Sequence, residues 1–387
     1  MELIETPWQL LSAFFMFICG AAIALAIRKR FQATQARVLL LYAWHSLWCM
    51  AYLWYSLNNV ADATLYYDVA KRGDLTFAPG TDFVNFLTGI LVEYLGLSYL
   101  GAFLFFNILG SVGLIAFDGC LRTATRDKAR FWRRLATLII FLPSVSFWSS
   151  AIGKDAISFM AACLALWATL DLGRNYRLMA VSIIAMLLVR PHIAGLMVFG
   201  IVTSSLLQSR LSVSKKIFFV VSSIAAATAL TPFALQYSGI TDSSVDGVLD
   251  YMQQREGYNM EGGGAVDISS LSLPLKIVTY LFRPFPFEAH SISALAASLD
   301  NMVLLFLFAA GMAQAFKRSS RSLLMRHSFA WSYSLLALLV LAMTTANLGI
   351  AVRQKWMFLP MLIFLLLFIA GSRRIKDVPV RAVAFRL

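Results

Sequence analysis

The chain has 387 residues, of which 59% are hydrophobic and only 14% are charged, and its formal net charge is +13. Such a composition cannot provide the polar surface of a soluble domain, which excludes a soluble enzyme, a secreted disulfide scaffold and a nucleic-acid-binding protein. It predicts an all-α, polytopic bundle of membrane-spanning helices.

The first apolar run covers residues 8–27. It follows Glu2 and Glu5, lacks a small-residue cleavage site, and is followed by the basic stretch 28–30. Because Lys and Arg tend to stay in the cytoplasm, this run predicts an uncleaved span whose N-terminus lies outside.

Further apolar runs follow along the whole chain. They cover residues 38–58, 98–120, 135–152, 156–171, 178–189, 193–208, 217–236, 292–316, 328–346 and 356–371. The sequence therefore predicts eleven spans, with the N-terminus outside and the C-terminus in the cytoplasm. With this topology, 24 of the 33 Lys and Arg residues lie inside, as expected for a multi-pass protein of a bacterial inner membrane.

The stretch 178–208 is interrupted by Arg190, Pro191 and His192. As a single span it would place Lys215 and Lys216 outside and invert every later loop, against the preference of basic residues for the cytoplasm. The residue before a proline also avoids the helical conformation. We therefore expect two short helices that meet at Arg190.

Within this single integral membrane domain, residues 1–387, two outer segments are too long to be simple connectors. Residues 59–97 end in an apolar stretch, 83–97, which is short for a span and is typical of a helix lying in the membrane interface. Residues 237–291 begin acidic and glycine-rich and become apolar and aromatic. Outer-face chemistry would lie in these two segments.

Two aspartates of the first outer segment are candidate catalytic carboxylates. Asp62 and Asp68 follow the second span, and a carboxylate there could accept a proton from an attacking hydroxyl. The alternative is a solvated polar loop that Lys71 and Arg72 neutralise.

Cationic and imidazole side chains near the outer ends of spans are candidate ligands of a lipid diphosphate, since guanidinium groups bind phosphate oxygens bidentately. The alternative is that they reach lipid headgroups or pair with outer carboxylates. The candidate set is Lys154, Arg190, His192, Arg283, Arg353 and Lys355. Asp155, beside Lys154, is expected to cap the following helix.

The remaining reactive side chains give no further site. His45 lies within a span and is expected to hydrogen-bond to a neighbouring helix. Ser149 and Ser150 have no histidine near them in the sequence, which argues against a serine hydrolase. The four cysteines lie in apolar runs without metal-ligand spacing. We expect no cofactor, and a divalent metal ion held by an outer aspartate is the alternative.

Several segments resemble bacterial polysaccharide-biosynthesis membrane proteins of the Wzy-like or EpsG-like polymerase kind, within the C-type (GT-C) glycosyltransferases. The resemblance covers about residues 60–360 and rests on residues 147–155, 190–192, 282–286 and 347–355. Unlike many members, this chain has no adjacent acidic pair in the first outer segment.

This resemblance implies a GT-C-like fold and a polymerase that joins glycan units carried on undecaprenyl diphosphate at the outer face of the inner membrane. Its expected partners are the polyprenyl-linked glycan, the lipid bilayer and other polysaccharide assembly and export proteins. Two alternatives remain open. A flippase or transporter of lipid-linked oligosaccharide would use the same cations for binding, and a structural or assembly subunit would tolerate their replacement.

The topology predicts that a cysteine placed at Gly263 reacts with a membrane-impermeant thiol reagent added from outside intact cells. A cysteine placed at Arg210 should react only after the membrane is opened. Labelling of the Gly263 position from the cytoplasm alone would show that the topology is wrong from the sixth span onward.

Overall fold

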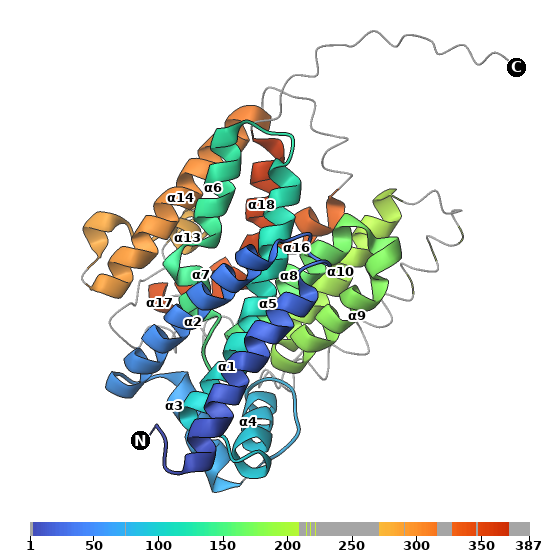
Figure 1. Cartoon of the computed structure of the whole chain (residues 1–387). Helices are drawn as coiled ribbons and strands as arrows, with labels where there is room; N and C mark the ends of the chain where they lie inside the picture. Colours follow the sequence, from blue (N-terminus) through green and yellow to red (C-terminus); the bar gives the residue numbers. More distant parts are fainter. Residues whose placement is uncertain are drawn as a thin grey trace, which may run out of the picture.

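The computed structural model describes residues 3–73, 75–208, 214, 217, 221, 271–289, 291–315, 327–345 and 347–370. In these ranges the regular secondary structure is helical, as the composition predicts, and the helices pack side by side (Figure 1). Their bounds are α1 (Pro7–Ile27), α2 (Gln35–Asn58), α3 (Asp62–Arg72), α4 (Thr81–Gly89), the π-helix η1 (Ile90–Tyr94), α5 (Tyr99–Thr125), α6 (Arg130–Ile140), α7 (Pro143–Trp148), α8 (Lys154–Leu170), α9 (Leu172–Val189), α10 (Pro191–Gln208), α13 (Leu273–Phe282), the 3-10 helix η2 (Pro286–Glu288), α14 (Ile292–Ala315), α16 (Ser328–Thr344), α17 (Leu348–Gln354), the 3-10 helix η3 (Lys355–Met357) and α18 (Leu359–Ile369).

The long helix α5 lies at the centre of this arrangement. It contacts α1, α2, α6, α8 and α18, and most of its side chains are buried. Gly113 allows α8 to approach closely, because a Cβ atom at this position would lie 2.8 Å from the Cα of Met160. By contrast, α1 exposes large apolar side chains such as Phe14 and Phe15, a pattern suited to contact with lipid.

Four described helices are long and apolar enough to cross a membrane. They lie at Pro7–Ile27, Tyr99–Thr125, Leu172–Val189 and Ala294–Gln314. The pair Leu348–Met357 and Leu359–Ile369, bent by 67°, would make a fifth crossing if it forms one span. These apolar helices support a multi-pass membrane protein.

The total of eleven spans stays a prediction, because most of the expected span 217–236 lies outside the described residues. Residues 135–152 also differ from a single span. There α6 ends at Ile140 and a new helix, α7, begins at Pro143, since proline is readily accommodated in the first turn of a helix but not in its interior.

The expected break at Arg190 is confirmed. Helix α9 ends at Val189, Arg190 has φ −148° and ψ 76°, and α10 begins at Pro191. The two helices pack against each other. The break leaves Arg190 outside the regular helix, at the end of α9.

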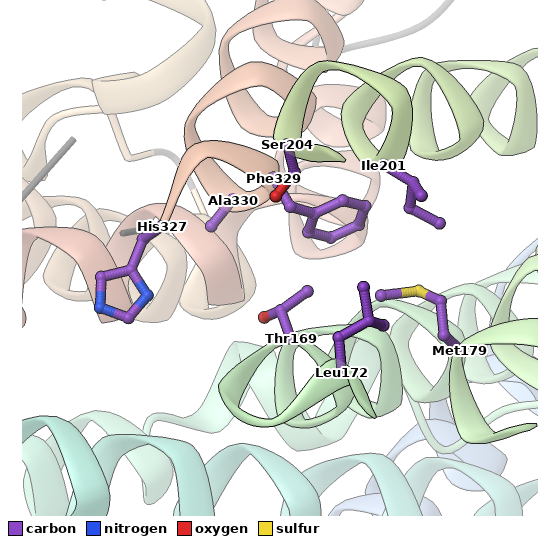
Figure 2. A pocket seen from close by; sticks show the side chains of 8 residues that line it. All are labelled: Thr169, Leu172, Met179, Ile201, Ser204, His327, Phe329 and Ala330. Atoms are coloured by element: carbon purple, nitrogen blue, oxygen red, sulfur yellow. The ribbon is translucent and has the colours of Figure 1, made fainter. Parts of the chain in front are cut away.

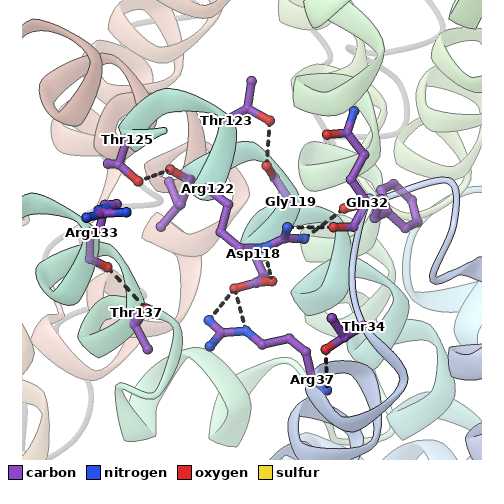
Figure 3. Close-up of polar contacts among 12 residues, drawn as sticks. Gln32, Thr34, Arg37, Asp118, Gly119, Arg122, Thr123, Thr125, Arg133 and Thr137 are labelled. Atoms are coloured by element: carbon purple, nitrogen blue, oxygen red, sulfur yellow. Dashed lines mark hydrogen bonds and ion pairs between the residues drawn. The ribbon is translucent and has the colours of Figure 1, made fainter. Parts of the chain in front are cut away.

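The buried carboxylate of Asp118, on α5, holds the turn between α1 and α2 (Figure 3). It accepts hydrogen bonds from Arg37 Nη2 at 2.6 Å and from Arg122 Nε at 2.8 Å. Arg122 also donates to the carbonyl oxygens of Phe31 and Gln32, at 2.8 Å and 2.7 Å. A single carboxylate thus orders two guanidinium groups and, through Arg122, the backbone of the turn.

We expect Asp118→Asn to lower the free energy of unfolding by about 1–3 kcal/mol, because two arginines lose their counter-charge while water still reaches part of each guanidinium. Thermal unfolding of the purified protein in detergent measures the change. Asp127→Asn, at an exposed position just beyond α5, is the matched control, with an expected effect within about 0.5 kcal/mol. Equal shifts in the two variants would contradict the assigned role of Asp118.

Candidate functional site

Four segments that are far apart in the sequence meet around Asp155. Asp155 lies in the first turn of α8, Arg190 follows α9, Arg353 lies near the end of α17, and Asp62 is the first residue of α3. Together with Lys154, these residues are called the Asp155 cluster below. Three of the predicted diphosphate ligands and one predicted catalytic carboxylate therefore come together.

Two ion pairs join the carboxylate of Asp155 to the two arginines. Arg190 Nη2 donates to Asp155 Oδ1 at 2.6 Å, and Arg353 Nε lies 3.0 Å from Asp155 Oδ2. Arg353 also reaches Asp62, with Nη1 donating to Oδ2 at 2.6 Å. The guanidinium of Arg353 consequently bridges two carboxylates that belong to different helices.

Exposure differs across the Asp155 cluster. The side chain of Arg190 is 9% exposed and that of Asp155 is 17% exposed, whereas the side chain of Asp62 is 49% exposed. The Asp155–Arg190 pair is thus shielded from water, and Asp62 forms the accessible side of the cluster. With three cations and two carboxylates, the cluster has a formal charge of +1.

Burial also affects two ionisable groups beside these pairs. Lys154 lies just before the apolar segment 156–171. Burial and the nearby guanidinium of Arg190 lower the pKa of its ammonium group to about 8. Burial raises the pKa of the Tyr66 hydroxyl, and the carboxylate charges of Asp62 and Asp155 act in the same direction. Tyr66 is therefore a neutral hydroxyl at neutral pH.

The sequence predicts Asp155 as the N-cap of α8, and this assignment is wrong. Gly153 occupies the N-cap position, and no side chain caps that end of the helix. Asp155 lies within the first turn, where the helix dipole favours a negative charge. The sequence signal for Asp155 is an acidic residue just after a short apolar connector, with arginines only at distant positions. No local motif marks Asp155 as a central residue.

The ion pairs of the Asp155 cluster do not include the other predicted site residues. Arg283 pairs with the neighbouring Glu288, with 2.9 Å between Nη2 and Oε1. Burial alone would raise the pKa of Glu288, but hydrogen bonds from the Phe285 backbone and from Arg283 lower it. Asp68 lies on α3, six residues after Asp62, and His192 is exposed on α10.

Lys355, predicted as a diphosphate ligand, is fully buried. Its Nζ donates to Asn301 Oδ1, and Asn301 Nδ2 donates to the Pro284 carbonyl oxygen at 3.0 Å. Asp300, which precedes Asn301 on α14, is also fully buried and accepts a hydrogen bond from Ser144 N at 3.2 Å. Lys355 thus belongs to a polar network inside the bundle.

The prediction that His45 bonds to a neighbouring helix is confirmed, since His45 Nδ1 lies 2.6 Å from Asn107 Oδ1 on α5. Ser149 has no histidine near it in the sequence, but His45 contacts it in the structure. His45 Nε2 lies 3.0 Å from Ser149 Oγ. Both side chains are buried, so this pair cannot meet an aqueous substrate.

A small pocket lies away from the Asp155 cluster, between α8, α9, α10 and α16 (Figure 2). Its lining is mainly apolar, with Thr169, Ser204 and His327 as the polar members. Among the described residues, no group of three or more His, Cys, Asp or Glu side chains is arranged to hold a metal ion.

Comparisons of the chain with protein-family models, with curated proteins and with solved structures give no match.

We expect Asp155→Asn to destabilise the protein by about 1–3 kcal/mol, because Arg190 is left buried without its counter-charge. Asp62→Asn should cost less than about 1 kcal/mol, since water screens a half-exposed pair. Thermal unfolding in detergent compares the two. A larger loss in Asp62→Asn would show that Asp155 is not the central partner of the cluster.

Proposed function

We propose that the protein is a membrane glycosyltransferase, a polysaccharide polymerase that joins glycan units carried on polyprenyl diphosphate. It acts at the outer face of a bacterial inner membrane, with the N-terminus outside and the C-terminus in the cytoplasm. The proposed architecture is a GT-C-like bundle of eleven spans. The apolar helices support the membrane setting. The resemblance of residues 147–155, 190–192, 282–286 and 347–355 supports the choice of substrate.

The observation that carries the proposal is the Asp155 cluster, in which Arg190, Arg353 and Lys154 gather beside the half-exposed Asp62. In the contacts that define the cluster, Arg190 uses Nη2 toward Asp155, and Arg353 uses Nη1 toward Asp62 and Nε toward Asp155. A guanidinium has five N–H donors. Both arginines thus retain donors that suit the oxygens of a diphosphate, and the positive formal charge favours an anionic ligand.

The proposed reaction assigns separate roles to these groups. A hydroxyl of the acceptor glycan attacks the anomeric carbon of the donor while the bond from that carbon to the diphosphate oxygen breaks. The carboxylate of Asp62 accepts the hydroxyl proton. The diphosphate leaves with the bonding electron pair, and Arg190, Arg353 and Lys154 stabilise its negative charge.

The remaining predicted residues have supporting roles in the proposed function. Asp68 is the second candidate base on α3, and His192 and Arg283 are candidate contacts to the donor. Lys355 supports the site from within the bundle, because its ammonium bonds to Asn301. No metal or other cofactor is assigned, and the partners are the lipid-linked glycan, the bilayer and other polysaccharide assembly and export proteins.

A flippase of lipid-linked oligosaccharide is the second candidate. The fully buried Asp300 and Lys355 favour it, since ionisable groups inside a bundle often lie on a transport pathway. The same cations of the Asp155 cluster would then bind the diphosphate without any bond being formed or broken. The two functions differ in whether the glycan is lengthened, which can be measured without a membrane.

In detergent, purified protein supplied with lipid-linked repeat units should lengthen them, and Asp62→Asn should reduce the rate by roughly 100- to 10,000-fold. This is the range expected for loss of a general base. Asparagine keeps the size of the side chain, so the donor should still bind. Gel analysis of labelled glycan measures the rate, and Asp82→Asn, on α4 of the same outer segment, is the matched control.

Unchanged repeat units with folded wild-type protein would favour the flippase, because no membrane is present for a flippase to act across. Lengthening that survives in Asp62→Asn would keep the transferase and move the base to Asp68.

A further inference from the structure

The connector between α7 and α8, residues 149–153, is buried along its whole length. Loops normally run over a protein surface, because a buried backbone needs partners for its polar groups. Lys154 and Asp155 follow this connector directly. The position of the connector therefore determines where Asp155 meets Arg190 and Arg353.

Two helices hold the first half of the connector. His45, on α2, lies 3.0 Å from Ser149 Oγ through Nε2 and 2.6 Å from Asn107 Oδ1 through Nδ1. Asn107, on α5, in turn donates from Nδ2 to Ser46 Oγ at 2.9 Å. The chain of contacts runs from α5 through His45 to Ser149, and all four side chains are buried.

Packing around Ser149 leaves no free space on the α5 side. A Cβ atom at Gly110 would lie 2.0 Å from the carbonyl oxygen of Ser149 and 2.6 Å from Cε1 of His45. The thiol of Cys49 lies one turn along α2 from His45, with Sγ 3.6 Å from the carbonyl oxygen of Ser150. Cys49 is fully buried beneath the connector.

We propose that His45 is a positioning residue, which fixes the connector through Ser149 and thereby sets the place of Asp155 between Arg190 and Arg353. Its effect on the connector follows from the contacts alone, whereas its effect on turnover rests on the proposed function. Catalysis is sensitive to such placement, because a shift of about 1 Å in a site can reduce a rate by about 100-fold.

Two substitutions separate the contacts of His45. In His45→Gln the amide reaches the position of Nε2 and keeps the contact with Ser149. In His45→Asn the shorter amide reaches the position of Nδ1, keeps the contact with Asn107 and loses Ser149. Each variant keeps one contact, so a purely structural role of the ring predicts similar behaviour for both.

The native cysteines report on the connector without any assay of glycan transfer. Full-length protein in detergent is treated with N-ethylmaleimide, and the rate at each cysteine is followed by peptide mass spectrometry. We expect Cys49 in His45→Asn to react about three- to tenfold faster than in the wild type, as loss of one hydrogen bond implies. In His45→Gln the rate should stay within about twofold of the wild type.

Cys120 and Cys163, which are buried in the core away from the connector, are the internal controls. Their protection distinguishes local loosening from general unfolding. Should His45→Asn expose them as well, Ser149→Ala replaces it, with the same expected change at Cys49. Equal Cys49 rates in the two His45 variants, or continued protection in both His45→Asn and Ser149→Ala, would overturn the proposal.

The lengthening assay then tests the consequence. His45→Asn should lower the rate by about 10- to 100-fold, and His45→Gln should retain most of it. An exposed Cys49 with undiminished lengthening would overturn the positioning role. If the wild type itself does not lengthen glycan, the result contradicts the proposed function and not the role of His45. The labelling result still decides whether His45 fixes the connector.

Discussion

The arrangement of the described chain depends most on one shared carboxylate, that of Asp155. A buried charge is costly unless it is paired and hydrogen-bonded. Asp155 forms ion pairs with arginines from two different parts of the sequence and accepts a hydrogen bond from Arg190. Because Arg353 also binds Asp62, the pairing of Asp155 fixes the relative positions of α3, α8, the end of α9 and α17. The accessible carboxylate of Asp62 is thus held in place by Arg353, whose own side chain is less exposed to water.

The sequence allows some of this to be predicted, for physical reasons that differ from residue to residue. Hydropathy predicts the long apolar helices such as α1 and α5, and Pro191 predicts the break that leaves Arg190 at a helix end, because both signals are local. The meeting of Asp62 with Arg353, 291 residues later, cannot be read from spacing. The same holds for the role of Asp155, since an acidic residue at a helix start is equally compatible with capping. Arg283 and Lys355 were indistinguishable from Arg190 and Arg353 by sequence, yet Arg283 pairs with its neighbour Glu288 and the ammonium of Lys355 lies within the bundle.

Buried polar contacts support this cluster from two sides. On one side, His45 and Asn107 hold the connector that precedes Asp155. On the other, Asn301 holds Lys355, two residues after Arg353, while the neighbouring Asp300 bonds to Ser144 at the start of α7. In an apolar bundle, dispersion contacts alone permit small sliding movements of helices, whereas a hydrogen bond between side chains selects one register. The Asp155 cluster is therefore flanked by buried hydrogen bonds that determine the distances between its charged groups.

The long separation between Asp62 and Arg353 has a consequence for biogenesis. Domains generally form in the order in which a chain is synthesised, so Asp62, Asp155 and Arg190 enter the membrane well before the ribosome reaches α17. Until that helix arrives, Arg190 is the only arginine of the cluster available to Asp155, and Asp62 lacks its partner. Docking of α17 is then the step that completes the set of charges. A nascent chain truncated before Leu348 would contain every earlier member of the cluster and still lack the guanidinium that joins its two carboxylates, so the site is complete only after α17 has been synthesised.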